Sequence, residues 1–241
     1  MSDASLSYEP GRIARIVFDQ PAKKNAINAP GWDVLAAALV DFASDDAARV
    51  LVLTGANDEF CSGADLSGGI TGSPDSVASK LREVNDIIAR LHEVPKPTLA
   101  VVPGVAAGVG LSLALCCDLV LAGERSRFGS VWSRVGLTPD GGAGWLLPRL
   151  VGPARAKELL LTGAVIDAAE ADRIGLVNRV VPDAGLVAAA DALADQLASC
   201  PPVVAARALT LIDEAWTRTF VEDLDAEVEA QQAAVAARRP T

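Results

Sequence analysis

A stretch of 21 residues without a charged side chain, from Pro97 to Cys117, constrains the fold of this chain more than any other feature. Its length would let a helix span a bilayer. Prolines and glycines interrupt the stretch, however, at Pro97, Pro103, Gly104, Gly108 and Gly110. Its first part, TLAVV, is rich in β-branched residues, and its last part, LSLALCC, favours a helix. We therefore expect a buried strand, a turn and a buried helix, and no membrane insertion.

Apolar runs alternate with helical patterns along most of the chain. The runs expected to be strands are 12–18, 49–55, 98–104 and 118–124, and the segments expected to be helices are 31–43, 77–93, 109–117 and 154–163. This alternation is typical of βαβ units with a mostly parallel sheet. From Leu186 onward the chain is Ala-rich and reads as helical, except at Pro201 and Pro202. We predict an α/β fold with a core over residues 1–188 and a helical lobe over residues 189–241.

Composition removes several classes of function. Acidic residues number 31 and basic residues 21, for a net charge of −10, which argues against nucleic-acid binding and anionic membrane surfaces. The single histidine, His92, and the lack of zinc-ligand spacing exclude a multi-histidine metal site. No CxxC pair occurs among the four cysteines, and the N-terminus does not read as a signal peptide. These features predict a reduced cytoplasmic protein without a bound metal.

Small residues gather where strands give way to loops, in residues 53–66, 103–129 and 135–163. Small side chains let a ligand approach the backbone closely. A helix that begins near Gly108 would present free N–H groups, and two such groups aimed at one carbonyl oxygen form an oxyanion hole. The same glycines and alanines would also suit tight strand–helix packing, so composition leaves both interpretations open.

The motifs FCSGADL, GVAAGVGLSLALCCD and GLTPDGGAGWLLPRLVG resemble, in order and spacing, the crotonase (enoyl-CoA hydratase/isomerase) superfamily. The resemblance extends from FDQPAKKNAIN at 18–28 to RIGLVNRVVP at 173–182. It implies a ββα spiral core and a helical C-terminal lobe that assembles trimers or hexamers. It also implies an acyl-CoA thioester as substrate, as in fatty acid metabolism, with no cofactor beyond the coenzyme A of that substrate. The shared chemistry would be stabilisation of a thioester enolate.

The resemblance carries roles onto particular residues. Ala64 matches the first backbone donor of the oxyanion hole, and Val109 matches the second, where the family usually has glycine. Lys23 and Lys24 match the region that touches the nucleotide part of coenzyme A. We interpret Asp65 as bracing the loop that follows Ala64. The residues expected beside the substrate are Lys24, Ala26, Ser62, Asp65, Leu66, Gly108, Ser112 and Trp132.

The departures from the family are equally informative. The two glutamates of family hydratases align with Ser112 and Trp132, so both carboxylates are absent. Adding water to a double bond needs a base for the water and an acid for the carbon. An ordinary hydratase mechanism therefore does not fit this chain. Trp132 reads as a wall of the acyl pocket, or simply as a core residue.

Asp140 offers a different chemistry. It lies in LTPDGGAG, which resembles the loop of ring isomerases that act on phenylacetyl-CoA epoxide products and of some enoyl-CoA isomerases. A single carboxylate can remove a proton from one carbon and return it to another. Asp140 could also cap the helix that follows, and the two roles can coexist. Its pKa is open even in sign, because a helix N-terminus would lower it and burial would raise it.

Three alternatives remain beside the isomerase. Trp132 and Asp140 stand eight residues apart, as do the tryptophan and nucleophilic aspartate of 4-chlorobenzoyl-CoA dehalogenases, but the matching histidine position is Asn85. His92 lies seven residues further along. A hydratase with unusual acid and base groups is the second alternative. An acyl-CoA binding protein that has lost catalysis is the third.

Overall fold

The computed structural model describes residues 4–67 and 73–238. The strands are β1 (Leu6–Glu9), β2 (Ile13–Phe18), β3 (Val50–Gly55), β4 (Thr98–Val102), β5 (Val105–Ala107), β6 (Leu119–Gly123), β7 (Arg127–Gly129), β8 (Val165–Asp167) and β9 (Arg179–Val181). The helices are α1 (Ala29–Ser44), α2 (Pro74–Glu93), α3 (Val109–Cys116), α4 (Ala143–Val151), α5 (Pro153–Thr162), α6 (Ala168–Arg173), α7 (Leu186–Ser199), α8 (Pro202–Glu214) and α9 (Phe220–Ala236). Short 3₁₀ turns are η1 (Pro21–Lys23), η2 (Val131–Val135) and η3 (Asp183–Gly185).

The main sheet has the strand order β1-β2-β3-β4-β6-β9. All of its neighbouring strands are parallel except β1 and β2, which are antiparallel. The expectation of a mostly parallel sheet is therefore confirmed. Because parallel strands end at the same edge, the loops after β2, β3 and β4 come together there. A smaller sheet with the order β5-β7-β8 adjoins that edge.

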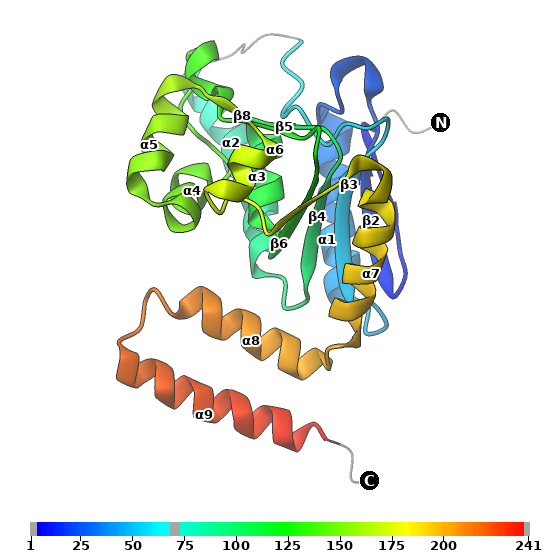
Figure 1. Ribbon diagram of the computed structural model, residues 1–241, viewed down its shortest axis with the longest axis vertical. Coiled ribbons are helices and arrows are strands. Elements are labelled where there is room, and N and C mark those ends of the chain that lie inside the picture. Colours follow the sequence, from blue (N-terminus) through cyan, green and yellow to red (C-terminus); the bar gives the residue numbers. More distant parts are fainter. Residues whose placement is uncertain (1–3, 68–72, 239–241) are drawn as a thin grey trace.

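The central strands are apolar throughout because both faces of the sheet are covered. In β3, Val50 and Val52 pack with α7, whereas Leu51 and Leu53 point into the larger core on the opposite face. Strand β4 alternates in the same way. Continuous apolar runs are typical of parallel strands buried on two sides. Figure 1 shows α7 on one side of the sheet, with α1 and α3 beyond the other.

The charge-free segment folds as β4, β5 and α3, in that order. The expected strand, turn and buried helix are confirmed, and β5 is an additional short strand. All eight residues of α3 are buried, which explains the absence of charge. Within residues 4–67 and 73–238, no helix combines the length and the apolar character that a membrane crossing requires.

The C-terminal helices separate into two groups. Helix α7 packs on the sheet through Leu186, Ala190, Ala194 and Ala198. The boundary expected at residue 188 therefore falls inside a helix of the core. Helices α8 and α9 form a hairpin that stands apart from the sheet (Figure 1).

Candidate active site

The loop after β3 runs beside the loop after β2. Ile27 N donates to Gly63 O at 2.8 Å, and Asp65 N donates to Ile27 O at 2.9 Å. In such a parallel bridge the residue between, Ala64, directs its own N–H to the other side. Among the described residues, no protein atom accepts a hydrogen bond from that N–H. The fold thus leaves the Ala64 amide free at the sheet edge.

A second free amide lies at the start of α3. Val109 is the first residue of this helix, so its N–H has no acceptor within the helix. Gly108 precedes it at a φ of 54°, a left-handed conformation that favours glycine. The two segments are in close contact, since a Cβ atom placed on Gly63 would lie 3.6 Å from Val109 N. The structure therefore brings the two expected oxyanion-hole residues to neighbouring backbone.

Trp132 and Asp140 form a pair. Trp132 is 3% exposed, and its Nε1 donates to Asp140 Oδ1 at 2.9 Å. Ser112 is fully buried, and its Oγ donates to the backbone oxygen of Asp140 at 2.9 Å. Trp132 and Ser112 thus both hold Asp140 in place. Among the described residues, Trp132 is the only side chain that donates to this carboxylate, and the backbone amide of Asp140 is a further donor.

The environment of Asp140 raises its pKa above the ordinary carboxyl value. Desolvation by burial is the largest cause, and the hydrogen bonds from Trp132 and from the Asp140 amide oppose it. The direction of the Asp140 pKa shift, which the sequence left open, is therefore upward.

The alternative role of the Asp140 side chain, as a cap of the following helix, is contradicted by the structure. Helix α4 begins at Ala143, its N-cap is Gly142, and no side chain caps it. Only the backbone oxygen of Asp140 takes part, as acceptor from Ala143 N at 3.1 Å. Gly141 and Gly142, both at positive φ, turn the chain between Asp140 and the helix. The carboxyl group is consequently directed elsewhere.

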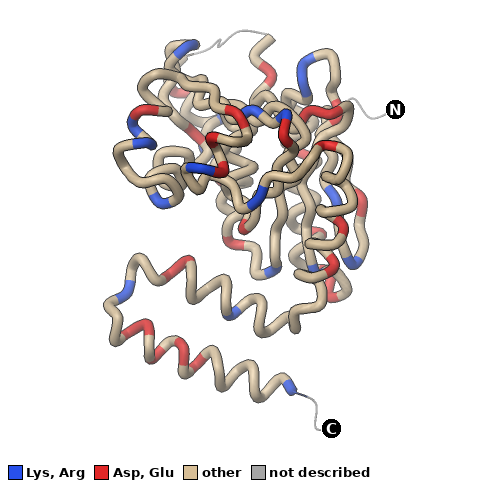
Figure 2. The backbone as a smooth tube through the Cα atoms, viewed as in Figure 1, with Lys and Arg blue, Asp and Glu red and all other residues tan. Residues whose placement is uncertain are grey.

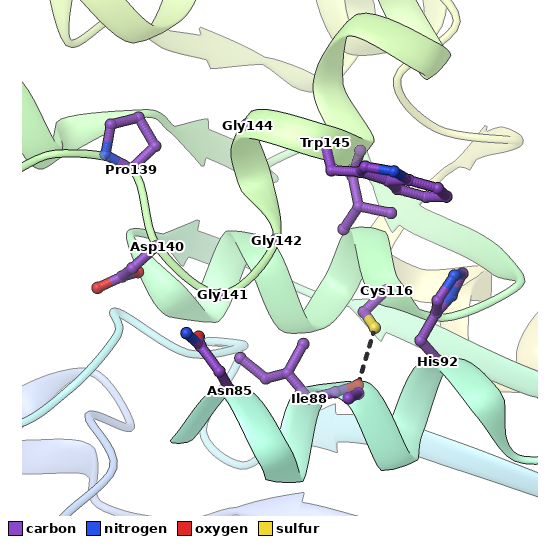
Figure 3. A pocket seen from close by; sticks show the side chains of 12 residues that line it. Asn85, Ile88, His92, Cys116, Pro139, Asp140, Gly141, Gly142, Gly144 and Trp145 are labelled. Atoms are coloured by element: carbon purple, nitrogen blue, oxygen red, sulfur yellow. Dashed lines mark hydrogen bonds between the residues drawn. The ribbon is translucent and has the colours of Figure 1, made fainter. Parts of the chain in front are cut away.

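A cavity of about 490 Å³ lies between α2 and the start of α4. Its lining residues are Asn85, Ile88, Ala89, His92, Cys116, Pro139, Asp140, Gly141, Gly142, Gly144, Trp145 and Leu146. Among these described residues, Asp140 carries the only carboxyl group. Figure 3 shows Asn85 and Asp140 at one end of the cavity and His92 and Trp145 at the other.

Neither Ala64 nor Val109 lines this cavity, but the Val109 side chain lies just beyond Gly141. A Cβ atom placed on Gly141 would lie 3.0 Å from Val109 Cγ2 and 2.8 Å from Ile88 Cδ1. Gly141 thus fits between the first residue of α3 and the cavity wall on α2. Asp140, its neighbour in sequence, lies where the two regions meet.

The basic pair expected to meet the nucleotide is exposed and engaged in ion pairs. Lys23 Nζ donates to Asp65 Oδ2 at 2.6 Å, and Lys24 Nζ lies 3.3 Å from Glu59 Oε1. The bond from Lys23 is the largest of the causes that lower the pKa of Asp65 to about 2. Asp65 also accepts from Ser67 N at 3.0 Å, which agrees with a bracing role for its side chain.

The remaining predicted residues are distributed over the same loops. Ser62 Oγ donates to Lys23 O at 2.8 Å, which joins the two loops again. Ala26 is 5% exposed and Leu66 is 45% exposed, so only Leu66 offers a side chain to a ligand. Cys61 is buried, and burial raises the pKa of its thiol to about 12, so it stays protonated.

Sequence reasoning did not assign the cavity wall on α2 to the site. Asn85, Ile88, Ala89 and His92 follow the spacing i, i+3, i+4 and i+7, which places them on one helix face. That spacing is visible in the sequence, but it does not say what the face contacts. Trp145, on the helix after Asp140, lies at the opposite end of the cavity from Asp140.

Comparisons with known proteins agree on one family. The model of the family described as enoyl-CoA hydratase/isomerase matches residues 9–239. The 1,2-epoxyphenylacetyl-CoA isomerase of Escherichia coli K12 is 37% identical over 97% of this chain and 91% of its own. The 4-chlorobenzoyl coenzyme A dehalogenase-2 of an Arthrobacter species is 34% identical over 95% of this chain and 84% of its own. A crystal structure from Thermobifida fusca in complex with CoA superimposes with a TM-score of 0.89, at 33% identity, over 97% of this chain and 93% of that one.

Proposed function

Because the chain belongs to the enoyl-CoA hydratase/isomerase family, we propose that it binds an acyl-CoA thioester and shifts a proton between two carbons of the acyl group. Asp140 would be the acid and base, and the amides of Ala64 and Val109 would hold the thioester oxygen. The observation that carries this proposal is the Trp132–Asp140 hydrogen bond at 2.9 Å. It fixes the orientation of the Asp140 carboxylate in the turn that precedes α4.

The proposed reaction uses Asp140 in two steps and the two amides in both. Asp140 takes a proton from a carbon beside the thioester carbonyl, and negative charge moves onto the carbonyl oxygen. Two backbone N–H groups stabilise that oxygen without reorganising. Asp140 then returns the proton to a second carbon and the double bond moves. A raised pKa suits this cycle, since a carboxyl group that both takes and gives a proton works best near the operating pH.

Water addition is less well supported. It would require a base to activate the water and an acid to protonate the carbon. Ser112 and Trp132 align with the two glutamates that supply these groups in family hydratases. Both replacements are occupied in holding Asp140. The E. coli relative named as an isomerase, which matches nearly the whole chain, points the same way.

For the rest of the substrate, we propose that Lys23 and Lys24 meet the nucleotide part of coenzyme A. Ser62, Asp65 and Leu66 would line the path from there to Ala64. Ser62 bonds to the backbone oxygen of Lys23 and Asp65 to its ammonium group, and these bonds fix the loop after β3. Leu66 exposes apolar surface to a ligand. The proposed reaction needs no cofactor beyond the coenzyme A that the substrate carries.

A dehalogenase-like reaction is the second candidate, because His92 and Asn85 line the same cavity as Asp140. In that reaction Asp140 would attack an aromatic ring and a histidine would assist hydrolysis of the ester. His92, however, lies at the opposite end of the cavity from Asp140 (Figure 3). Because of the similarity to the Arthrobacter dehalogenase, the experiment below includes a test for this reaction, but we favour the isomerase.

The deciding experiment presents a panel of thioesters to the wild-type protein and to Asp140→Asn in heavy water. The panel holds linear 2- and 3-enoyl-CoAs, arylacetyl-CoA, oxepin-type CoA and 4-chlorobenzoyl-CoA. Mass spectrometry follows double-bond migration, deuterium uptake at carbon and water addition, and chloride release is measured separately. We expect migration with deuterium uptake, lost by at least about a hundredfold in Asp140→Asn.

The other outcomes each reject the proposal in a recognisable way. Hydration would mean that another group replaces the glutamate pair. Chloride release would favour the dehalogenase reaction. Binding without chemistry on every thioester would identify a non-catalytic acyl-CoA binding protein. Equal rates for the wild type and Asp140→Asn would remove Asp140 from the mechanism.

A further inference from the structure

The cavity beside Asp140 extends along helix α2. Its α2 wall runs from Asn85 to His92, seven residues or about 10 Å of helix. The opposite wall is the start of α4, where Gly141, Gly142 and Gly144 keep the space open. Its floor is fixed by Cys116 Sγ, which donates to Ile88 O at 3.5 Å and joins α3 to α2 (Figure 3). The cavity is thus a groove between α2 on one side and the turn into α4 on the other.

Polarity changes along this groove. Asp140 and Asn85 are polar and lie together at the near end, where Gly141 packs against the Val109 side chain. The middle is apolar, formed by Ile88, Ala89 and Leu146. At the far end the His92 and Trp145 rings lie 5.4 Å apart at 69°, and both residues also line a second cavity, of about 470 Å³. The guanidinium of Arg149 lies over the Trp145 ring, 3.7 Å from its centre, and favours this ring position through a cation–π contact.

We propose that this groove receives the distal part of the acyl group and that Trp145, with His92, sets the longest acyl group the protein accepts. The inference rests on the proposed function, because Asp140 marks the end at which the reacting carbons lie. A groove of about 490 Å³ with an apolar middle suits an apolar acyl group that extends about two helical turns beyond Asp140. The polar near end suits the reacting carbons and not the tail.

Gly144 allows the groove to be filled without disturbing the fold. It lies in the first turn of α4, and a Cβ atom placed on it would meet no heavy atom within 4 Å. Gly144→Leu therefore adds a side chain at the groove wall in open space. Gly185 also has no neighbour within 4 Å of such a Cβ but lies outside the groove, so Gly185→Leu is the matched control. Trp145→Ala makes the opposite change and opens the far end.

The test measures the dissociation constants of saturated acyl-CoA thioesters, from four to sixteen acyl carbons, by calorimetry. Saturated thioesters have no double bond to move, so the result does not depend on turnover. In the wild type, affinity should rise by up to about fourfold per added methylene until the groove is full. Gly144→Leu should weaken the longer thioesters by at least about tenfold and leave the four-carbon member unchanged. Trp145→Ala should move the plateau to longer acyl groups, and Gly185→Leu should match the wild type.

An affinity that is independent of acyl length in the wild type would overturn the proposal. So would a Gly144→Leu protein with the wild-type length profile. If Gly144→Leu instead changes the sedimentation coefficient and leaves the length profile intact, the groove is a contact between copies of the chain. Failure of the proposed reaction would appear separately, as an inactive wild type that still shows the length profile.

Discussion

At the residue scale, the site depends on what surrounds one carboxyl group. In the sequence, Ser112, Trp132 and Asp140 lie in three separate segments, and each was interpreted independently. In the structure all three are bonded together. The replacements for the two hydratase glutamates are thereby explained, since they position the aspartate that we propose as their substitute. The sequence could not show this, because hydrogen-bond direction depends on the fold of η2 and the loop after it.

Trp132→Phe tests this arrangement through pH. Asp140 acts as a base only when it is deprotonated, so kcat/KM should rise with pH through its pKa, which burial holds above the ordinary carboxyl value. The Trp132 hydrogen bond lowers that pKa in part, so its removal should move the rise to higher pH. Loss of positioning should also lower kcat by about tenfold or more.

The measurement is a pH–rate profile of kcat/KM for both proteins, on whichever thioester turns over. A profile that does not move in Trp132→Phe, or that moves to lower pH, contradicts the assigned role. Circular dichroism across the same range serves as the control, because it separates a shifted pKa from partial unfolding.

At the scale of elements, the turn into α4 positions Asp140. Gly141 has a φ of 58°, and a Cβ atom on it would lie 2.9 Å from Ser112 Cβ. The small residues of this loop indicated a close approach of a ligand or another segment to the backbone, but they did not identify α2 and α3 as the partners. That knowledge required the packing of helices that are distant in the chain.

Gly141→Ala should therefore be harmful while Gly144→Ala is tolerated. At Gly141 the new methyl group meets packed side chains and a left-handed backbone, which costs about 1–3 kcal/mol. It should also displace Asp140 and lower kcat/KM. Gly144 is the second residue of α4, and Gly144→Ala adds a methyl group in open space. This variant should keep both its stability and its activity.

Urea denaturation and steady-state kinetics check both variants. Equal stability of the two variants would show that the turn has room that the structure does not indicate. Retained activity in a destabilised Gly141→Ala protein would show that Asp140 is positioned independently of this turn.

At the scale of the whole molecule, the α/β crotonase-like fold expected from the motifs is confirmed by the superposition on family structures. The hairpin of α8 and α9 leaves large apolar side chains exposed, namely Ile212, Trp216, Phe220, Val221, Leu224, Val228 and Val235. On α9, Val221, Leu224, Val228 and Val235 follow a spacing that places them on one face. Acidic residues gather in the first half of the same helix (Figure 2). We propose that this apolar face packs against further copies of the chain in a homotrimer or hexamer.

Val228→Asp should weaken that assembly. Val228 is 57% exposed in a single chain, and a carboxylate buried there without a partner would cost on the order of 3 kcal/mol per contact. Val187 on α7 is 72% exposed but lies away from the hairpin, so Val187→Asp is the matched control.

Analytical ultracentrifugation should give a mass of three or six chains for the wild type and Val187→Asp, and a smaller mass for Val228→Asp. A wild-type protein that sediments as a single chain would reject the assembly. An unchanged mass for Val228→Asp would move the interface away from α9.

The sequence by itself determined the parallel sheet, the strand–turn–helix order of the charge-free segment and the family. These are local or repetitive patterns, because burial on both faces of a sheet requires apolar runs and backbone approach requires small residues. The tertiary structure alone decided that Asp140 does not cap α4, that its pKa is raised and that α7 belongs to the core. It also decided that one face of α2 lines the groove. Each of these outcomes depends on which distant segments meet, and desolvation and hydrogen bonding act through such contacts rather than along the chain.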